Sequence, residues 1–196
     1  MDFIVCGGIF VCENGGIIEV KNLSRAVFAF VIGVVAFVGA GCSTGTEGPS
    51  GQVSGALTPE QRFTLKNLRG EDIRLDGVLA ANKAVLVDFW ATWCGYCVEE
   101  MPDLIRLQQK YDRRPFTVLA VNAGESAHQV SLFNEKMKLN FPVLLDEEMI
   151  TLQKFGINGI PTSLLLDSQG KVLGVYHQYS SRLEQDVENA LKEDSS

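Results

Sequence analysis

Two cysteines, Cys94 and Cys97, are separated by two residues, a spacing that suits either a small disulfide ring or half of a metal site. Before them, Ala84–Trp90 is an apolar run rich in β-branched residues, which predicts a strand, and residues 99–111 predict a helix. A Cys-x-x-Cys sequence between a strand and a helix is typical of a redox site. Cys94 would then lie at a helix N-terminus, where free N–H groups and the helix dipole favour the reactive thiolate.

This redox hypothesis gives the two cysteines different tasks. Cys94 is the candidate nucleophile and is expected to be exposed, whereas Cys97 lies three residues further along the same helical face and is the candidate resolving thiol. A static disulfide is the alternative, although a ring of four residues closes little chain entropy. A zinc site is disfavoured because the chain has no second Cys-x-x-Cys pair and only His128 and His177. We therefore expect no metal and no cofactor.

Asp88 is the one acid within the apolar run Ala84–Trp90. Burial disfavours the charged form of a carboxyl group, so its pKa rises and the group can carry protons near neutral pH. The alternative is that Asp88 faces solvent on the other side of the strand. Glu99 and Glu100 are second candidates for proton transfer. Acids in the first turn of a helix also interact favourably with its dipole, and we prefer that interpretation for these two residues.

The rest of the chain predicts an α/β domain. Its 196 residues carry a net charge of −7, which argues against a nucleic-acid partner because phosphates require a basic surface. The order of the predicted elements favours a mixed central sheet covered by helices on both faces. Hydrophobic periodicity and turn residues predict β-hairpins at residues 62–75 and 163–176, strands at 116–121 and 141–145, and helices at 126–139, 148–155 and 183–191.

Residues 1–42 are expected to be a leader rather than part of the domain. Two basic residues precede residues 26–40, which are apolar or glycine throughout and resemble the hydrophobic region of a signal peptide. The run Gly39-Ala40-Gly41-Cys42 is similar to a bacterial lipobox, which implies lipidation of Cys42 after cleavage, although lipoboxes usually have Leu in place of Gly39. An uncleaved anchor and ordinary signal cleavage are the alternatives, and all three place the domain outside the cytoplasm.

Residues 1–19 contain three acids, which is unusual at the start of a signal peptide. We therefore expect a mis-extended reading frame whose true start lies near Val20, with a long natural n-region as the alternative. Residues 43–57 are rich in Gly, Ser and Thr and predict a flexible tether. The folded domain is then expected over residues 58–196.

Two segments carry a family resemblance: Val87-Asp88-Phe89-Trp90-Ala91-Thr92-Trp93-Cys94-Gly95-Tyr96-Cys97 and Ile160-Pro161-Thr162. Together they resemble the thioredoxin superfamily. The leader, the tether and an extra helix–strand pair at residues 126–145 resemble its membrane-anchored TlpA/ResA-type branch, a redoxin or AhpC/TSA-like domain. The resemblance covers residues 57–191 and implies a thioredoxin-like fold with an N-terminal β-hairpin and that pair as an insertion.

The same resemblance implies roles for individual residues. It implies a redox-active Cys94–Cys97 disulfide, an Asp88 carboxylate that accepts the proton of the resolving thiol, and a cis proline at Pro161 that packs against the dithiol. The residue before that proline, Ile160, would pair with the substrate backbone. The implied substrate-binding residues are Trp93, Gly95, Tyr96, Ile160, Pro161 and Thr162.

The expected function is a thiol–disulfide oxidoreductase that is membrane-anchored, faces the periplasm if the source is Gram-negative, and acts on disulfide- or thiol-containing extracytoplasmic proteins. A reductive role is expected, such as keeping apocytochrome c thiols open, with a membrane redox partner that recharges the dithiol. Gly95-Tyr96 in place of Gly-Pro restores a backbone N–H near the thiolate and predicts a somewhat less reducing potential.

Two other functions are the alternatives. A thiol peroxidase of the peroxiredoxin-related group needs Pro-x-x-x-Thr-x-x-Cys, and Ala91-Thr92-Trp93-Cys94 lacks that pattern. A non-catalytic lipoprotein module would bind partners through the same face, but the presence of both cysteines argues against it.

Overall fold

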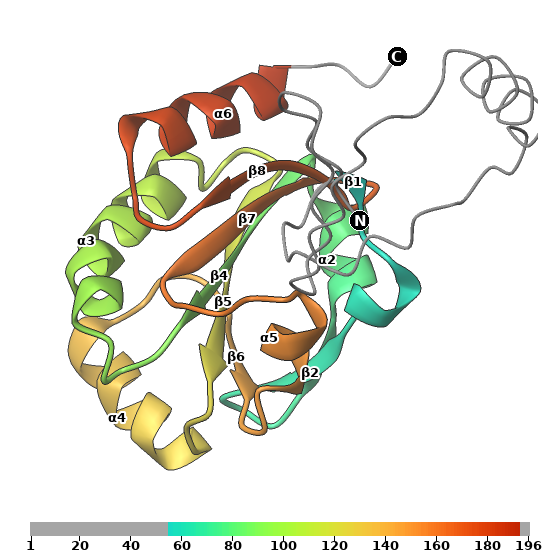
Figure 1. The fold of residues 1–196 in the computed structure, drawn as a ribbon. Helices are drawn as coiled ribbons and strands as arrows, with labels where there is room; N and C mark the ends of the chain where they lie inside the picture. The colour runs from blue at the N-terminus through green and yellow to red at the C-terminus, as the bar shows by residue number, and fades with distance from the viewer. Residues whose placement is uncertain (1–54, 193–196) are drawn as a thin grey trace, which may run out of the picture. The chain divides into compact units, whose positions relative to one another are not determined.

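Within residues 55–192, eight strands form one mixed sheet at the centre of the domain (Figure 1). The computed structural model describes residues 55–192, which all belong to one compact unit of the chain. The strands are β1 (Gly55–Ala56), β2 (Thr64–Asn67), β3 (Asp72–Arg74), β4 (Ala84–Trp90), β5 (Phe116–Ala123), β6 (Val143–Asp146), β7 (Thr162–Asp167) and β8 (Lys171–Tyr176). Their order across the sheet is β1-β8-β7-β4-β5-β6-β2-β3, with β4 parallel to β5 and antiparallel to β7.

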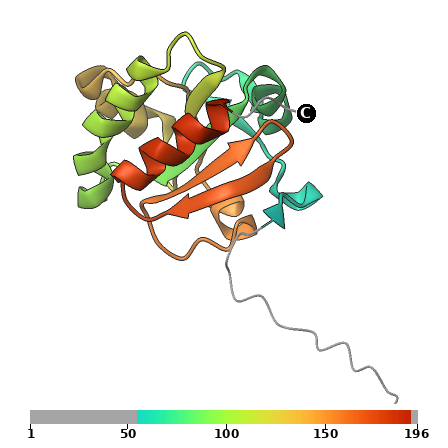
Figure 2. The ribbon, with the colours of Figure 1, turned by 90° about the horizontal axis from the view of Figure 1, so that it is seen from above.

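Helices cover both faces of this sheet (Figures 1 and 2). They are the 3-10 helix η1 (Pro59–Gln61) and the α-helices α2 (Leu75–Ala81), α3 (Gly95–Lys110), α4 (Ala127–Met137), α5 (Ile150–Lys154) and α6 (Ser181–Lys192). The apolar side chains of α3, α4 and α6 pack on one face, and those of α2 and α5 pack on the other. The predicted thioredoxin-like α/β fold is confirmed.

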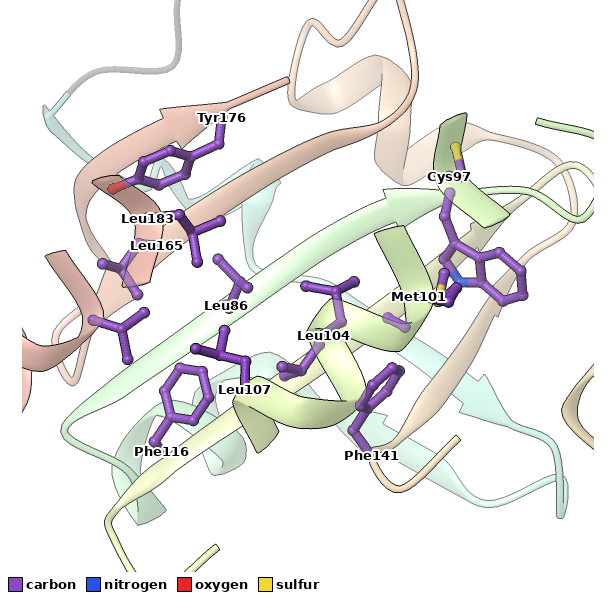
Figure 3. Close-up of a cluster of buried hydrophobic side chains, with 14 of the residues drawn as sticks. Leu86, Cys97, Met101, Leu104, Leu107, Phe116, Phe141, Leu165, Tyr176 and Leu183 are labelled. Carbon is purple, nitrogen blue, oxygen red and sulfur yellow. The ribbon is translucent and has the colours of Figure 1, made fainter. Parts of the chain in front are cut away.

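β4 lies inside the sheet, and all of its residues are buried. Successive side chains of a strand point to opposite faces, so Leu86 and Trp90 join the core beneath α3 and α6, whereas Val87 and Phe89 join the core beneath α2 and α5. Figure 3 shows the first of these cores, in which side chains of α3 such as Leu104 meet those of β4. A strand that is covered on both faces is buried along its whole length, so a polar side chain within it is buried as well.

The domain begins earlier than predicted. β1 pairs antiparallel with β8, and Leu57 packs into the core with only 6% of its surface exposed. The predicted tether over residues 43–57 is therefore wrong at its last three residues, and the boundary at residue 58 moves accordingly. Gly55 and Ala56 are ordered by backbone pairing with a strand more than a hundred residues away in sequence, which composition does not reveal.

Two local features also differ from the sequence expectations. The helix α2 was not predicted, although Leu75 and Leu79 are spaced as one buried helical face. α3 begins at Gly95 instead of residue 99, so the Cys-x-x-Cys segment forms its first turn. The predicted hairpins β2–β3 and β7–β8 are both confirmed as antiparallel pairs.

The predicted leader over residues 1–42, including residues 1–19, and residues 43–54 of the predicted tether lie outside the described residues. Over residues 55–192, no helix has the length and apolar character needed to cross a membrane.

Candidate functional site

The two cysteines of the motif are joined by a disulfide at the start of α3. Their Cα atoms are 5.3 Å apart. Cys94 is the N-cap residue, and its Sγ accepts a hydrogen bond of 3.3 Å from the backbone N–H of Cys97. The predicted position of Cys94 at a helix N-terminus is therefore confirmed. The same N–H can stabilise negative charge on Cys94 Sγ once the disulfide is reduced.

The two sulfurs differ in access, although less than the sequence suggested. Cys94 has 8% of its surface exposed and Cys97 has none, so the expectation of an openly exposed Cys94 is wrong. The reason is tertiary, because the loop before β7 packs over the disulfide. The flanking Trp93 and Tyr96 are instead the exposed groups, at 69% and 68%.

The loop over the disulfide contains a cis peptide bond between Ile160 and Pro161, as expected. The carbonyl oxygen of Ile160 lies 3.7 Å from Cys94 Sγ. A disulfide sulfur carries no proton, so this is a packing contact in the oxidised protein, and it becomes available as a hydrogen bond when Cys94 is a thiol. Thr162 secures the loop because its hydroxyl donates to the carbonyl of Gly159 at 2.7 Å.

A hollow of about 700 Å³ opens beside this loop and reaches the motif. Of the predicted substrate-binding residues, Tyr96, Ile160, Pro161 and Thr162 line the hollow. Trp93 and Gly95 are not among its lining residues, and they flank the disulfide on the surface instead.

His177, which the sequence analysis considered only as a zinc ligand, also lines this hollow. Its Nδ1 lies 3.2 Å from the Thr162 hydroxyl oxygen. The single proton of that hydroxyl is directed to Gly159, so Nδ1 must be the donor to Thr162 and the Nε2 atom is left for other partners. Among residues 55–192, no group of three or more His, Cys, Asp or Glu side chains could hold a metal ion.

Asp88 is completely buried, so the predicted burial is confirmed and the solvent-facing alternative is wrong. By the alternation of β4, its side chain lies on the face that carries Leu86 and Trp90, which is the face beneath α3. Oδ1 accepts a hydrogen bond of 2.8 Å from the Ser163 hydroxyl, and Oδ2 has no hydrogen-bond partner among the described residues. Burial, and then the nearby charge of Glu100, raise the pKa of Asp88 to about 8, against the opposing effect of the Ser163 bond.

Glu100 is buried, contrary to the prediction from its sequence position. Only 4% of its surface is exposed, whereas its neighbour Glu99 is exposed. One Glu100 carboxylate oxygen accepts a 2.9 Å hydrogen bond from the backbone N–H of Tyr179, and the other has no partner among the described residues. Burial raises the pKa of Glu100, and the Tyr179 bond opposes that shift. Because α3 begins at Gly95, neither Glu99 nor Glu100 lies in its first turn, and the helix-dipole interpretation is wrong for both residues.

A sequence signal for the burial of Glu100 exists. Glu100 lies three residues after Cys97 and four before Leu104, which is the spacing of one helical face. The buried residues of α3 on this face are Cys97, Glu100, Met101, Leu104 and Leu107. An acid on the apolar stripe of an amphipathic helix is the same kind of signal as Asp88 within an apolar strand. Two acids thus belong to the layer between β4 and α3.

Comparison with solved structures places this geometry in a known class. A Chlorobium tepidum protein provisionally named thiol:disulfide interchange protein DsbE matches with a TM-score of 0.64 and 32% identity, over 70% of this chain and 97% of that one. A second Chlorobium tepidum protein, a thiol:disulfide interchange protein of the thioredoxin family, matches with a TM-score of 0.59 and 28% identity, over 68% and 96% of the two chains.

Sequence relatives agree with the structural ones. The thiol-disulfide oxidoreductase ResA of Geobacillus thermodenitrificans is 36% identical over 118 residues, which is 60% of this chain and 66% of that protein. The thioredoxin-like protein YneN of Bacillus subtilis is 38% identical over 117 residues, 58% of this chain and 66% of that protein. The match thus spans slightly less than two thirds of these relatives' own length.

The fold, the disulfide at the start of α3 and the cis proline opposite it define a thioredoxin-superfamily protein of the TlpA/ResA type. The AhpC/TSA family model matches residues 57–175, and the chain belongs to that family.

Proposed function

We propose that this chain is a thiol–disulfide oxidoreductase that exchanges the Cys94–Cys97 dithiol and disulfide with cysteines of other proteins. The observation that carries the proposal is the disulfide itself, placed at a helix N-terminus with its more accessible sulfur beside the cis-proline loop. The relatives named thiol-disulfide oxidoreductase and thiol:disulfide interchange protein support it.

In the reductive direction, the Cys94 thiolate attacks one sulfur of a substrate disulfide. The substrate S–S bond breaks, a mixed disulfide with Cys94 forms, and the released substrate thiolate takes a proton from water. Cys97 then attacks Cys94 Sγ, the mixed disulfide breaks, and the second substrate thiolate leaves. Two electrons pass from the dithiol to the substrate, and the Cys94–Cys97 disulfide remains.

The second attack requires that Cys97 lose its proton inside the core, where no solvent reaches it. Asp88 is the proposed acceptor because its carboxyl lies in the same layer and has an unpartnered oxygen. Its pKa of about 8 is close to that of an ordinary thiol, so the proton moves between them at little cost in free energy. Glu100, also buried and with an unpartnered oxygen, is the second carboxyl that can take part.

The hollow beside the cis-proline loop is the proposed docking site for the substrate segment around its cysteine. Tyr96 and Ile160 belong both to the surroundings of the disulfide and to the lining of the hollow. The carbonyl of Ile160 can accept from a substrate N–H after the contact with Cys94 opens, and exposed Trp93 adds apolar contact.

The proposed setting is extracytoplasmic, with the domain held at a membrane through lipidated Cys42. Residues 26–42 support this through their apolar run and lipobox-like end. The proposed partners are disulfide-containing extracytoplasmic proteins, apocytochrome c among them, and a membrane protein that returns electrons to the dithiol. Mass spectrometry of the mature N-terminus tests the anchor: a diacylglyceryl group on Cys42 supports it, and an intact segment before Cys42 contradicts it.

Trapping tests the activity and its substrates together. In a Cys97→Ser variant the mixed disulfide cannot be resolved, so substrate proteins should remain bound to Cys94 and be released by a reductant. A Cys94→Ser/Cys97→Ser double variant is the matched control and should trap nothing. Absence of captured proteins, together with failure of the native chain to reduce a protein disulfide such as that of insulin, would contradict the proposal.

The AhpC/TSA family match makes peroxide reduction the second activity to measure. If the chain were a thiol peroxidase, its reduced form would consume hydrogen peroxide far faster than it reduces a protein disulfide. We expect the opposite ratio, because Cys94 does not lie in the Pro-x-x-x-Thr-x-x-Cys sequence that a peroxidatic cysteine needs.

A further inference from the structure

Glu125 is a buried acid that the mechanism above does not use and that the sequence analysis did not single out. Only 4% of its surface is exposed. One carboxylate oxygen accepts hydrogen bonds from the backbone N–H of Thr92 at 2.6 Å and from the side-chain amide of Asn122 at 2.7 Å. The other oxygen accepts a hydrogen bond from the Thr92 hydroxyl. The carboxylate therefore holds Thr92 at two points.

The fold explains how residues 33 positions apart meet. β4 and β5 are parallel neighbours in which Trp90 pairs with Asn122, so both strands end at the same edge of the sheet. After β5 the chain turns at Gly124, which has a φ of +77° and whose N–H donates to the carbonyl of Asp146. This turn returns Glu125 toward the loop that follows β4.

That loop leads straight into the disulfide. It contains only residues 91–93 before Cys94, which is the N-cap of α3. The N–H of Cys94 donates to the carbonyl of Ala91 at 3.2 Å, so Thr92 is enclosed within the same turn that carries Cys94. A group that fixes both the N–H and the hydroxyl of Thr92 thereby limits where Cys94 Sγ can lie relative to Cys97.

We propose that Glu125 is a positioning residue for the dithiol: its clamp on Thr92 holds Cys94 within bonding reach of Cys97 and so favours the disulfide. This role rests on the proposed function only for its biological use, because it concerns the chain's own thiol–disulfide equilibrium. Holding two reacting groups in place raises the effective concentration of one at the other. Without the clamp, the loop samples other conformations after reduction and the disulfide forms less readily.

The test is the equilibrium of the Cys94–Cys97 pair with reduced and oxidised glutathione, measured at 25 °C on the full chain. Thr92→Val removes the hydroxyl donor, and Glu125→Ala removes the whole clamp. We expect both to lower the equilibrium constant for disulfide formation, Glu125→Ala by about tenfold, which corresponds to a potential about 30 mV less reducing. The double variant should fall no further than Glu125→Ala alone, because both changes break the same contact.

Three controls separate positioning from general stability and from charge. Thr92→Ser keeps the N–H and the hydroxyl, so it should retain the native equilibrium. Glu147→Ala removes an exposed carboxylate that accepts a hydrogen bond from the Ala127 N–H at 3.3 Å and does not touch Thr92. This variant should also retain the native thiol–disulfide equilibrium. Glu125→Gln keeps the shape of the side chain and loses its charge. Its equilibrium constant for disulfide formation should lie nearer to that of the native protein than the constant of Glu125→Ala does.

The outcomes decide between the alternatives. An unchanged equilibrium in both Thr92→Val and Glu125→Ala, with only a lower melting temperature, would show a structural role and overturn the proposal. A shift in Glu125→Gln as large as in Glu125→Ala, with none in Thr92→Val, would assign the effect to charge and also overturn it. Thr92→Val keeps the test available if Glu125→Ala does not fold. Failure of the chain to act on protein substrates would leave this measurement unaffected.

Discussion

The hydroxyl of Ser163 on β7 donates a 2.8 Å hydrogen bond to Oδ1 of Asp88 on β4, directly across the antiparallel pair. Asp88 Oδ2 is buried and has no partner among the described residues. One hydrogen bond does not replace the hydration that a carboxylate loses on burial, so the neutral acid is favoured until the pH is alkaline. This relationship gives a carboxyl group that can exchange a proton with a thiol.

Asp88→Asn should stabilise the fold at neutral and alkaline pH. The pKa of Asp88 is raised from 3.8 in the unfolded chain to about 8 in the folded protein, so the folded protein binds the proton more tightly. Native stability therefore falls as pH rises from about 4 to 8, by as much as about 1.4 kcal/mol per pH unit from this group. An asparagine at position 88 does not ionise, so the variant does not lose this stability. Denaturant unfolding of the two oxidised proteins, native and Asp88→Asn, gives the free energy of unfolding at several pH values. Plotted against pH, the two curves should meet near pH 4 and separate above it. Parallel curves would contradict the burial of Asp88.

The same substitution should slow resolution of the mixed disulfide. Asp88→Asn removes the proton acceptor and keeps the shape, so attack by Cys97 should slow by roughly the 10²-fold typical of a lost general base. Initial attack by Cys94 should change much less. Stopped-flow reduction of a disulfide peptide separates the two steps. Equal loss in both steps would point to a general disturbance of the site instead.

Glu100→Gln and Ser163→Ala should move the pKa of Asp88 in opposite directions. The charge of Glu100 raises this pKa, so Glu100→Gln should lower it, whereas the Ser163 bond lowers it, so Ser163→Ala should raise it. Resolution by Cys97 requires the ionised form of Asp88, and its rate should therefore reach half its maximum at a lower pH in Glu100→Gln. In Ser163→Ala that midpoint should move to higher pH. Shifts of the same sign in both variants would contradict the assigned causes.

Cys94 and Cys97 should differ strongly in reactivity after reduction. Cys94 retains some exposure and accepts a hydrogen bond from an α3 N–H, whereas Cys97 is fully buried. Iodoacetamide should therefore modify Cys94 at least about tenfold faster near neutral pH, since alkylation needs an accessible thiolate. Peptide mapping after brief alkylation gives the ratio, and comparable labelling of both residues would exclude Cys94 as the nucleophile.

Much of the fold was predictable from local sequence, and the reasons are specific. Ala84–Trp90 is a continuous apolar run because both faces of β4 are covered, and Asp88 within it had to be buried for the same reason. The Cys-x-x-Cys spacing places the two sulfurs one helical turn apart, which is close enough for the disulfide that the structure contains. Pro161 was identified by its resemblance to the cis proline of the family, and that bond is cis.

Other features depended on contacts between distant segments, which no local pattern encodes. Gly55–Ala56 has no strand character of its own and becomes a strand because β8 offers an edge to pair with. Cys94 is mostly covered because the Ile160–Pro161 loop folds over it. Glu100 could have been found from the apolar stripe of α3, but its partner, the N–H of Tyr179, lies 79 residues away.

The residues of the dithiol and their chemistry were thus determined by the sequence itself, since spacing along one helix and burial along one strand are local properties. The environment that tunes them was decided only by the tertiary structure. Glu125 meets Thr92 because two parallel strands end at one edge of the sheet, and Asp88 meets Ser163 because β4 pairs with β7 in that register. Strand order and register follow from the packing of the whole core, so these contacts could be found only in the folded chain.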